Sequence, residues 1–167
     1  MKIRKGVLAS VLAVVLTVCT LVASATAKDA NFAIGVRPIG FSTNPDQYTL
    51  GVQSVMGRVS RMRFAPSVDF GFGDDVNLTA LNFDLKLDLF SPPKASALFY
   101  AGLGPTISII SPDQGDTDTE IGLSLVGGIK LPFGQKNYYN LETRFGIGDI
   151  PDFKLLIGVM FGFGRVD

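Results

Sequence analysis

Hydrophobic and polar residues alternate with a period of two along most of the chain beyond residue 27. In residues 153–164 the odd positions carry large apolar side chains, whereas the even positions include Lys154 and three glycines. Successive side chains of a β-strand point to opposite faces, so a period of two predicts a strand with two unlike faces. We therefore expect this segment to be large and apolar on one side and mostly small or polar on the other.

The same alternation recurs in residues 61–70, 81–89, 121–131 and 140–147. In residues 81–89, for example, five apolar side chains are interleaved with Asn82, Asp84, Lys86 and Asp88. Turn-forming residues separate such segments at seven places, which are residues 44–46, 57–58, 73–75, 91–93, 111–119, 134–137 and 148–152. Seven turns predict an all-β chain of eight strands, over residues 31–41, 48–57, 60–72, 76–90, 97–110, 119–133, 138–147 and 153–164.

Residues 95–112 allow a second interpretation, because they carry no charge over 18 positions and so meet the length criterion for a transmembrane helix. Gly102, Gly104 and Pro105 interrupt this segment, and four β-branched residues follow them. Glycine, proline and β-branched residues all disfavour a helix interior. We therefore expect a strand here.

The first 27 residues have the features of a secretory signal peptide. Lys2, Arg4 and Lys5 precede an uncharged apolar stretch over residues 7–22, and two A-x-A cleavage patterns follow at residues 23–25 and 25–27. We expect cleavage near Ala27 and a mature barrel domain over residues 28–167. An uncleaved anchor helix is the alternative, and we expect Cys19 to be removed with the signal peptide.

Composition narrows the function further. The whole chain has 167 residues, with 15 basic and 15 acidic residues, one cysteine and no histidine. This length fits a single domain. The absence of histidine excludes Ser-His-Asp catalysis and His-ligated zinc or haem, and the charge balance gives no sign of nucleic-acid binding. Loss of residues 1–27 removes three basic residues and the cysteine, so the exported chain has no disulfide to stabilise it.

An eight-stranded antiparallel sheet hides its edges by closing into a barrel. The large apolar face is nearly continuous around the predicted sheet, whereas the other face mixes glycine with charge. We therefore predict an up-and-down transmembrane β-barrel with lipid outside and a polar lumen, since strands of about ten tilted residues span the roughly 25 Å apolar band of such barrels. The charges predicted to face the lumen are Arg37, Arg61, Arg63, Asp69, Asp84, Lys86, Asp88, Lys130, Glu142, Arg144 and Lys154.

Aromatic residues and turn charges are consistent with this arrangement. The aromatic residues of the apolar parity are predicted to form two girdles, one of Phe64, Phe99, Phe133, Tyr139, Phe161 and Phe163 and the other of Tyr48, Phe70, Phe72, Phe145 and Phe153. The first, third, fifth and seventh turns contain acidic but no basic residues, whereas the other three contain no acidic residue and have Arg58, Lys94 and Lys136 within them or directly after them. Because an even number of strands puts both termini on one side, we expect the acidic turns to face outside and the basic turns to face the periplasm.

This pattern resembles the small eight-stranded outer-membrane barrels of Gram-negative bacteria, the class of the OmpA transmembrane domain and OmpX. The resemblance covers the signal peptide and essentially all of residues 28–167. Its final strand, residues 153–163, looks like the alternating aromatic C-terminal signal read by the barrel-assembly machinery. The resemblance implies an outer-membrane location, contact with membrane lipid and lipopolysaccharide, and insertion by that machinery. Enzymes of similar size in this group, the lipid A deacylases and palmitoyl transferases, rely on a catalytic histidine that this chain lacks.

Counting residues away from the predicted turns places lumen charges opposite one another. The expected neighbours are Arg61 with Asp88, Arg63 with Lys86, Lys130 with Glu142, and Asp84 and Asp88 diagonal to Arg63. Buried charges must be paired or hydrated, so we expect a network that plugs the lumen. A narrow charged channel is the alternative.

Three other features are weaker candidates for chemistry. Asp113, Asp116, Asp118 and Glu120 offer oxygen ligands for Ca²⁺ but lack the spacing of an EF-hand, so we expect a solvated acidic loop and no bound metal. The carboxylate pair Asp84 and Asp88 is expected to be scaffold, although an acid–base pair is the alternative. The Gly-x-Gly pairs at 71/73, 102/104, 146/148 and 162/164 open no helix, as a dinucleotide site would require, and are expected at lumen or bend positions.

The sequence therefore predicts an outer-membrane barrel with a structural or interaction role, at most a narrow polar lumen, no enzymatic activity and no cofactor. A small passive, porin-like pore is the first alternative. A soluble periplasmic lipid-binding barrel is the second, and it would require the apolar parity to face inward.

Overall fold

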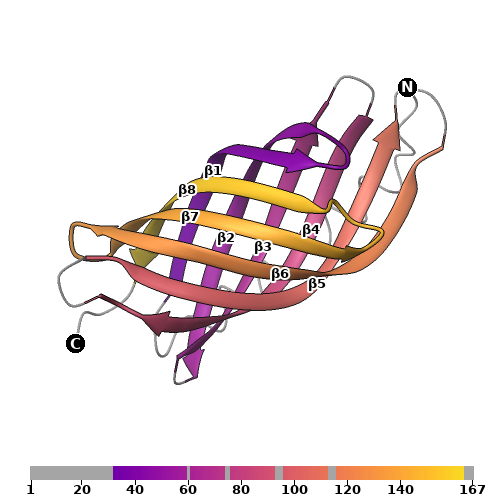
Figure 1. The fold of residues 1–167 in the computed structure, drawn as a ribbon. Coiled ribbons are helices and arrows are strands. Elements are labelled where there is room, and N and C mark those ends of the chain that lie inside the picture. The colour runs from indigo at the N-terminus through magenta and orange to yellow at the C-terminus, as the bar shows by residue number, and fades with distance from the viewer. Residues whose placement is uncertain (1–31, 60, 74–75, 93–95, 113–115, 164–167) are drawn as a thin grey trace.

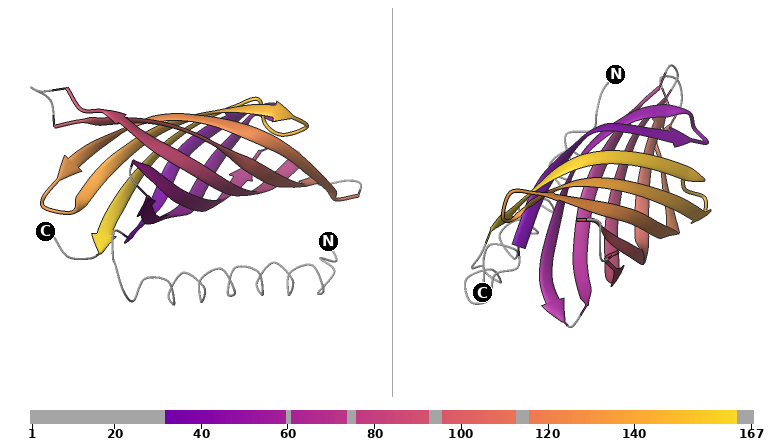
Figure 2. Two further views of the ribbon diagram at one scale, coloured as in Figure 1. Left: turned by 90° about the horizontal axis from the view of Figure 1, so that it is seen from below. Right: turned by 60° about the vertical axis from the view of Figure 1, so that its left-hand side comes forward.

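A computed structural model describes residues 32–59, 61–73, 76–92, 96–112 and 116–163. The strands are β1 (Phe32–Thr43), β2 (Gln47–Val59), β3 (Met62–Phe72), β4 (Val76–Phe90), β5 (Leu98–Pro112), β6 (Asp118–Phe133), β7 (Asn137–Gly148) and β8 (Phe153–Phe163). Each strand pairs antiparallel with its neighbours in chain order, and β1 pairs with β8. The sheet thus closes into a barrel whose strands run obliquely around it (Figure 1 and Figure 2). The predicted eight-stranded antiparallel up-and-down barrel is confirmed.

The predicted strand limits agree with the observed ones to within two residues. Most of the segment with a helical alternative, residues 95–112, is strand β5, so that alternative is wrong. Across the described residues, no helix has the length and apolar character needed to cross a membrane. The expected signal peptide, its cleavage site and Cys19 lie outside the described residues.

A bulge in β1 changes which residues face the lumen. The pairing of β1 with both β2 and β8 shifts register around Pro38. Proline has no N–H to donate to the ladder, and a bulge is a place where a sheet tolerates it. As a result the buried positions of β1 are odd-numbered up to Arg37 and even-numbered from Gly40 onward.

The two faces of the sheet have opposite character. Large apolar side chains on the outward face remain exposed, for example Leu125 at 44% and Ile157 at 43%. Charged side chains on the inward face are buried instead, with Arg37, Asp84 and Glu142 at 0% exposure. This is the arrangement predicted for a transmembrane barrel. The soluble lipid-binding alternative requires the apolar side chains to point inward, so its assignment of the two faces is wrong.

Aromatic side chains mark both ends of the outward face. We call the end where β1 begins and β8 ends the chain-end rim, and the opposite end, with the turns after β1, β3, β5 and β7, the far rim. At the chain-end rim lie Phe64, Phe99, Phe133, Tyr139, Phe161 and Phe163, and at the far rim lie Tyr48, Phe70, Phe72, Phe145 and Phe153. Each of these side chains is exposed or half-buried, and pairs of rings touch across strands, with centroids 4.4 Å apart for Phe133 and Tyr139.

Candidate functional site: the charged lumen

Most of the charges predicted to face the lumen do so. The buried ones are Arg37, Asp69, Asp84, Lys86, Asp88, Lys130, Glu142, Arg144 and Lys154, and Arg63 is half-buried. Arg61 is exposed, so its predicted place in the lumen is wrong. It lies in the turn just before β3, and its backbone carbonyl accepts a hydrogen bond from Asp88 N at 3.0 Å.

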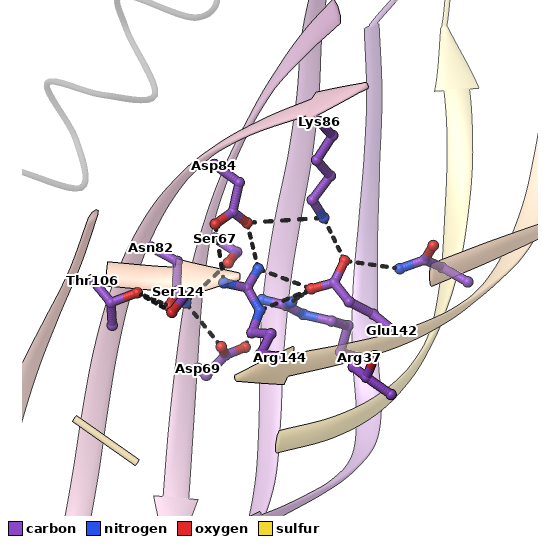
Figure 3. A network of polar contacts seen from close by, with 12 residues as sticks. Arg37, Ser67, Asp69, Asn82, Asp84, Lys86, Thr106, Ser124, Glu142 and Arg144 are labelled. Carbon is purple, nitrogen blue, oxygen red and sulfur yellow. Dashed lines mark hydrogen bonds and ion pairs between the residues drawn. The ribbon is translucent and has the colours of Figure 1, made fainter. Parts of the chain in front are cut away.

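Glu142 on β7 is the centre of an ion cluster in the lumen (Figure 3). Its Oε1 accepts hydrogen bonds from Arg37 Nη1 at 3.1 Å and from Arg144 Nε at 2.9 Å. Its Oε2 accepts one from Lys86 Nζ and lies 2.7 Å from the Tyr100 hydroxyl. A buried carboxylate is tolerated when cations and donors surround it in this way. The groups that do so come from β1, β4, β5 and β7.

Two aspartates extend this cluster. Arg144 binds Asp84 through two nitrogens, with Nη1 donating to Oδ1 at 3.1 Å and Nη2 donating to Oδ2. Arg37 Nη2 lies 2.6 Å from Asp69 Oδ1. Three cations therefore share three carboxylates, and we call these six residues, Arg37, Asp69, Asp84, Lys86, Glu142 and Arg144, the Glu142 network. Four of these side chains, those of Arg37, Asp69, Asp84 and Glu142, have no solvent-accessible surface.

A chain of neutral polar groups continues from Asp69 along the inner wall of the barrel. Asn82 Nδ2 donates to Asp69 Oδ2 at 2.9 Å and to Ser67 Oγ at 3.1 Å. On its other side, Thr106 Oγ1 donates to Asn82 Oδ1 at 3.0 Å and lies 2.7 Å from Ser124 Oγ. These groups tie β3, β4, β5 and β6 together, because each is held by a residue on a neighbouring strand.

A second ion cluster lies nearer the chain-end rim. Asp88 on β4 accepts from Lys130 Nζ at 2.6 Å through Oδ1 and lies 2.9 Å from Arg63 Nη2 through Oδ2. The Lys130 ammonium also sits over the ring of Tyr100, 5.0 Å from its centroid, and over that of Tyr138 at 5.8 Å. Cation–π contacts of this kind add to the attraction of the carboxylate for the ammonium.

The strand register corrects one predicted pair. Lys130 lies opposite Asn140, and Glu142 lies opposite Gly128, so the expected pairing of Lys130 with Glu142 is wrong. The turn after β6 has only three residues, which places the two strands two residues away from the predicted register. Such a tight turn needs a left-handed residue, and Gly134 supplies it with φ +68°.

The contacts predicted around Arg63 agree with the observed register of β3 and β4. Arg63 lies opposite Lys86 and forms its ion pair with the diagonal neighbour Asp88. Asp84 is held by Arg144, whereas Asp88 is held by Lys130 and Arg63. Each carboxylate is therefore held by its own cations, as expected of scaffold residues.

The weak Ca²⁺ candidate gains no support from the described part of the chain. Asp113 lies outside the described residues. Asp116 and Asp118 are exposed, and Glu120 is half-buried at the start of β6. No group of three or more metal-binding side chains comes together among the described residues.

Glycines make room for the polar side chains of the lumen. A Cβ on Gly51 would lie 2.3 Å from Asp69 Oδ1, and one on Gly128 would lie 2.4 Å from the Tyr100 hydroxyl. Contacts this short do not occur, so each glycine creates the space for a neighbour's polar group. This explains why glycine and charge alternate on the same face in the sequence.

The set of lumen residues predicted from the sequence contains charged residues alone, so it leaves out the neutral members of the lumen, which are Tyr100, Asn140, Asn82, Thr106, Ser67 and Ser124. Their signal was present, because each lies on the same parity as the charged or glycine positions of its strand. Tyr100 is the most informative case. It is 2% exposed, and its hydroxyl lies between Glu142 and Asn140, so it belongs to the lumen and not to an aromatic girdle.

No protein-family model matches the chain, and no curated protein matches its sequence. Solved structures do match its fold. Neisserial surface protein A (NspA) is 16% identical with a TM-score of 0.62, over 79% of this chain and 95% of that one. The N-terminal β-barrel domain of Pseudomonas aeruginosa OprF is 16% identical with a TM-score of 0.65, over 81% and 100%. The Yersinia pestis outer membrane protein Ail, determined in a phospholipid nanodisc, is 8% identical with a TM-score of 0.54, over 81% and 100%.

At such low identity these matches establish the architecture alone. They agree with the closed antiparallel barrel observed for this chain. The chain therefore has the fold of the small eight-stranded outer-membrane β-barrels, the class of the OmpA transmembrane domain and OmpX.

Proposed function

We propose that this chain is an integral protein of the bacterial outer membrane with a structural or interaction role and a lumen closed by its own side chains. The observation that carries the proposal is the inverted placement of residues, with apolar side chains exposed outside and ion pairs buried inside. A monomeric soluble protein rarely exposes apolar patches beyond a few hundred Å². Here the apolar belt extends over all eight strands, as contact with lipid requires.

The Glu142 network supports the proposal that the lumen is closed. Its arginines and carboxylates come from β1, β3, β4 and β7 and interlock across the barrel. A conducting path would need water to reach these groups, whereas Arg37, Asp69, Asp84 and Glu142 are fully buried. A small passive pore is the alternative, and it requires the network to open.

The proposed orientation places the chain-end rim in the periplasm and the far rim outside the cell. Acidic residues of the far-rim turns, among them Asp46, Asp149 and Asp152, are exposed. At this level the outer leaflet carries lipopolysaccharide phosphates, with which carboxylates could share divalent cations. Lipid and lipopolysaccharide are therefore the proposed partners, and the barrel-assembly machinery is the proposed partner during insertion.

No catalytic role is proposed. The chain has no histidine, and the four buried carboxylates are each engaged by at least one cation. General acid–base chemistry needs a group within reach of a substrate proton, and these groups are shut inside the barrel.

Fractionation of cells that express the full chain tests the proposal. We expect the protein in the outer-membrane fraction, with faster gel migration before boiling than after it, because a closed barrel resists unfolding by detergent. Planar-bilayer recordings on the purified protein then distinguish a closed lumen from a conducting pore, and we expect no steady conductance. Recovery from the soluble periplasm would refute the membrane location, and stable single channels would replace the closed lumen with the pore.

A further inference from the structure

The charges inside the described barrel do not balance. The Glu142 network pairs three cations with three carboxylates. In the second cluster Asp88 is shared by Lys130 and Arg63, but the Arg63 side chain is 20% exposed, so water can screen its extra charge. The sixth inward cation, Lys154, has no carboxylate of its own among the described residues.

Lys154 is buried in the far half of the lumen. It is 3% exposed, and its Nζ has no hydrogen-bond partner within the described structure. On β8 it is paired in register with Arg144 of β7 on one side and with Ser42 of β1 on the other. Asp69 and Asp84 attract the Lys154 ammonium and Arg144 and Arg37 repel it, but both carboxylates are already bound by these arginines. The ammonium therefore lacks the direct partner that a buried charge requires.

Other polar groups in this half of the barrel are also unsatisfied. Thr49 Oγ1, Ser108 Oγ and Gln47 Oε1 are buried without a hydrogen-bond partner in the described structure. Buried polar atoms in proteins almost always have a partner, and a bound water or ion commonly serves as that partner where no protein group does. The far half of the lumen therefore has more polar groups than its own side chains can pair, with one positive charge in excess.

The turn between β7 and β8 covers this region from the far rim. Ile150 is 5% exposed, and its side chain fills the space above Gly122 and Gly146, where an added Cβ would lie 2.8 and 2.9 Å from it. Gly146 N donates to Asp152 O at 2.8 Å, and this hydrogen bond holds the turn over the far-rim end of the lumen. Gly146 is the next inward position after Arg144 on β7, so the cover sits close above the level of Lys154.

We propose that the far half of the lumen binds one small monovalent anion, such as a halide, with Lys154 as its positive ligand and buried hydroxyls as additional donors. The single unbalanced positive charge indicates an anion of charge −1, and the cover formed by Ile150 limits the size of that anion. This goes beyond the proposed membrane role, because binding requires neither conduction nor a particular location in the cell.

Unfolding of the refolded mature protein in detergent, with bromide as the probe, tests the site. A ligand that binds only the folded state shifts the unfolding equilibrium by a factor of 1 + [L]/Kd. We expect sodium bromide to stabilise the protein over sodium gluconate at equal ionic strength, about a hundredfold in the equilibrium constant at 100 times Kd. Lys154→Met should abolish this difference, whereas Lys136→Met, which removes an exposed lysine, should retain it.

Anomalous diffraction from crystals soaked in bromide supplies a second readout that needs no variant to fold. We expect a peak at hydrogen-bond distance from Lys154 Nζ. Equal bromide effects in the wild type and in Lys154→Met would overturn the proposal. The absence of any anomalous peak in the lumen would also overturn it, because water would then be the partner of the buried polar groups.

Discussion

Glu142→Gln isolates the energetic role of the lumen network, because it removes one negative charge and keeps the size of the side chain. Glu142 contacts Arg37, Arg144 and Lys86. After the substitution Arg37 keeps Asp69 at 2.6 Å, and Arg144 keeps its two-nitrogen contact with Asp84.

Lys86 is the cation that loses its partner. Its remaining carboxylate is Asp84, whose Oδ2 lies 3.9 Å from Lys86 Nζ and is already bound to Arg144. Breaking a buried ion pair by removing one partner costs about 3–5 kcal/mol. Because one cation and not three is left unpaired, we expect a loss of this size, which corresponds to about 10²- to 10⁴-fold in the unfolding equilibrium constant.

Urea unfolding in lipid vesicles, followed by circular dichroism and by gel mobility, measures this loss. These probes suit the chain because it has no tryptophan. Glu120→Gln is the matched control, since Glu120 is the only other glutamate and lies half-buried at the start of β6. We expect this control to change stability by no more than about 0.5 kcal/mol.

A second substitution checks the mechanism. Adding Lys86→Met to Glu142→Gln removes the unpaired ammonium, and most of the lost stability should return, since replacing both ions is often close to neutral. A loss in Glu142→Gln equal to that in Glu120→Gln would refute the reasoning. An unchanged loss in the double variant would show that Lys86 is not the source of the cost.

Three further predictions test other parts of the structure. Leu125→Arg should lower stability in vesicles by about 2–4 kcal/mol, because Leu125 lies on the lipid face, and urea unfolding within 0.5 kcal/mol of wild type would contradict this placement. Gly128→Ala should cost about 1–3 kcal/mol through the Tyr100 hydroxyl, whereas Gly127→Ala, whose Cβ would meet only Thr143 Oγ1 at 3.6 Å, should be close to neutral by the same measurement. Chelation of divalent cations should lower the thermal unfolding midpoint in vesicles that contain lipopolysaccharide and leave it unchanged in phospholipid alone, and an unchanged midpoint in both would remove the proposed cation bridges.

The barrel was predictable from sequence because lipid imposes a strict period of two. Along β4 the outward residues are all apolar from Leu81 to Leu89 and the inward ones are all polar from Asn82 to Asp88. The alternation by itself indicates a strand. The contrast between the apolar and the polar set also shows which face of that strand points into the barrel. The eight-strand count followed from turns rich in Gly, Pro, Asn and Asp, whose chemistry is local.

The contacts within the lumen were less predictable, because they depend on register across the barrel. The sequence predicts Lys130 opposite Glu142, but it lies opposite Asn140, since a three-residue turn shifts the register of the strand pair by two residues. Glu142 also contacts Arg37 and Lys86, which are more than 50 residues away in sequence. No spacing rule connects residues on strands that are not paired with each other. The place of Ile150 over Gly122 and Gly146 was hidden for the same reason.

Two adjacent tyrosines allow a direct test of the central claim, which is that successive residues face lipid and a closed polar lumen. Tyr139 is 51% exposed on the outward face, whereas the hydroxyl of Tyr138 is buried on the inward face. Since the chain has no tryptophan, Tyr139→Trp and Tyr138→Trp each create a single fluorescent probe. In vesicles of brominated lipid we predict strong quenching for Tyr139→Trp and little for Tyr138→Trp. Equal quenching of the two, or quenching of Tyr138→Trp alone, would contradict the account.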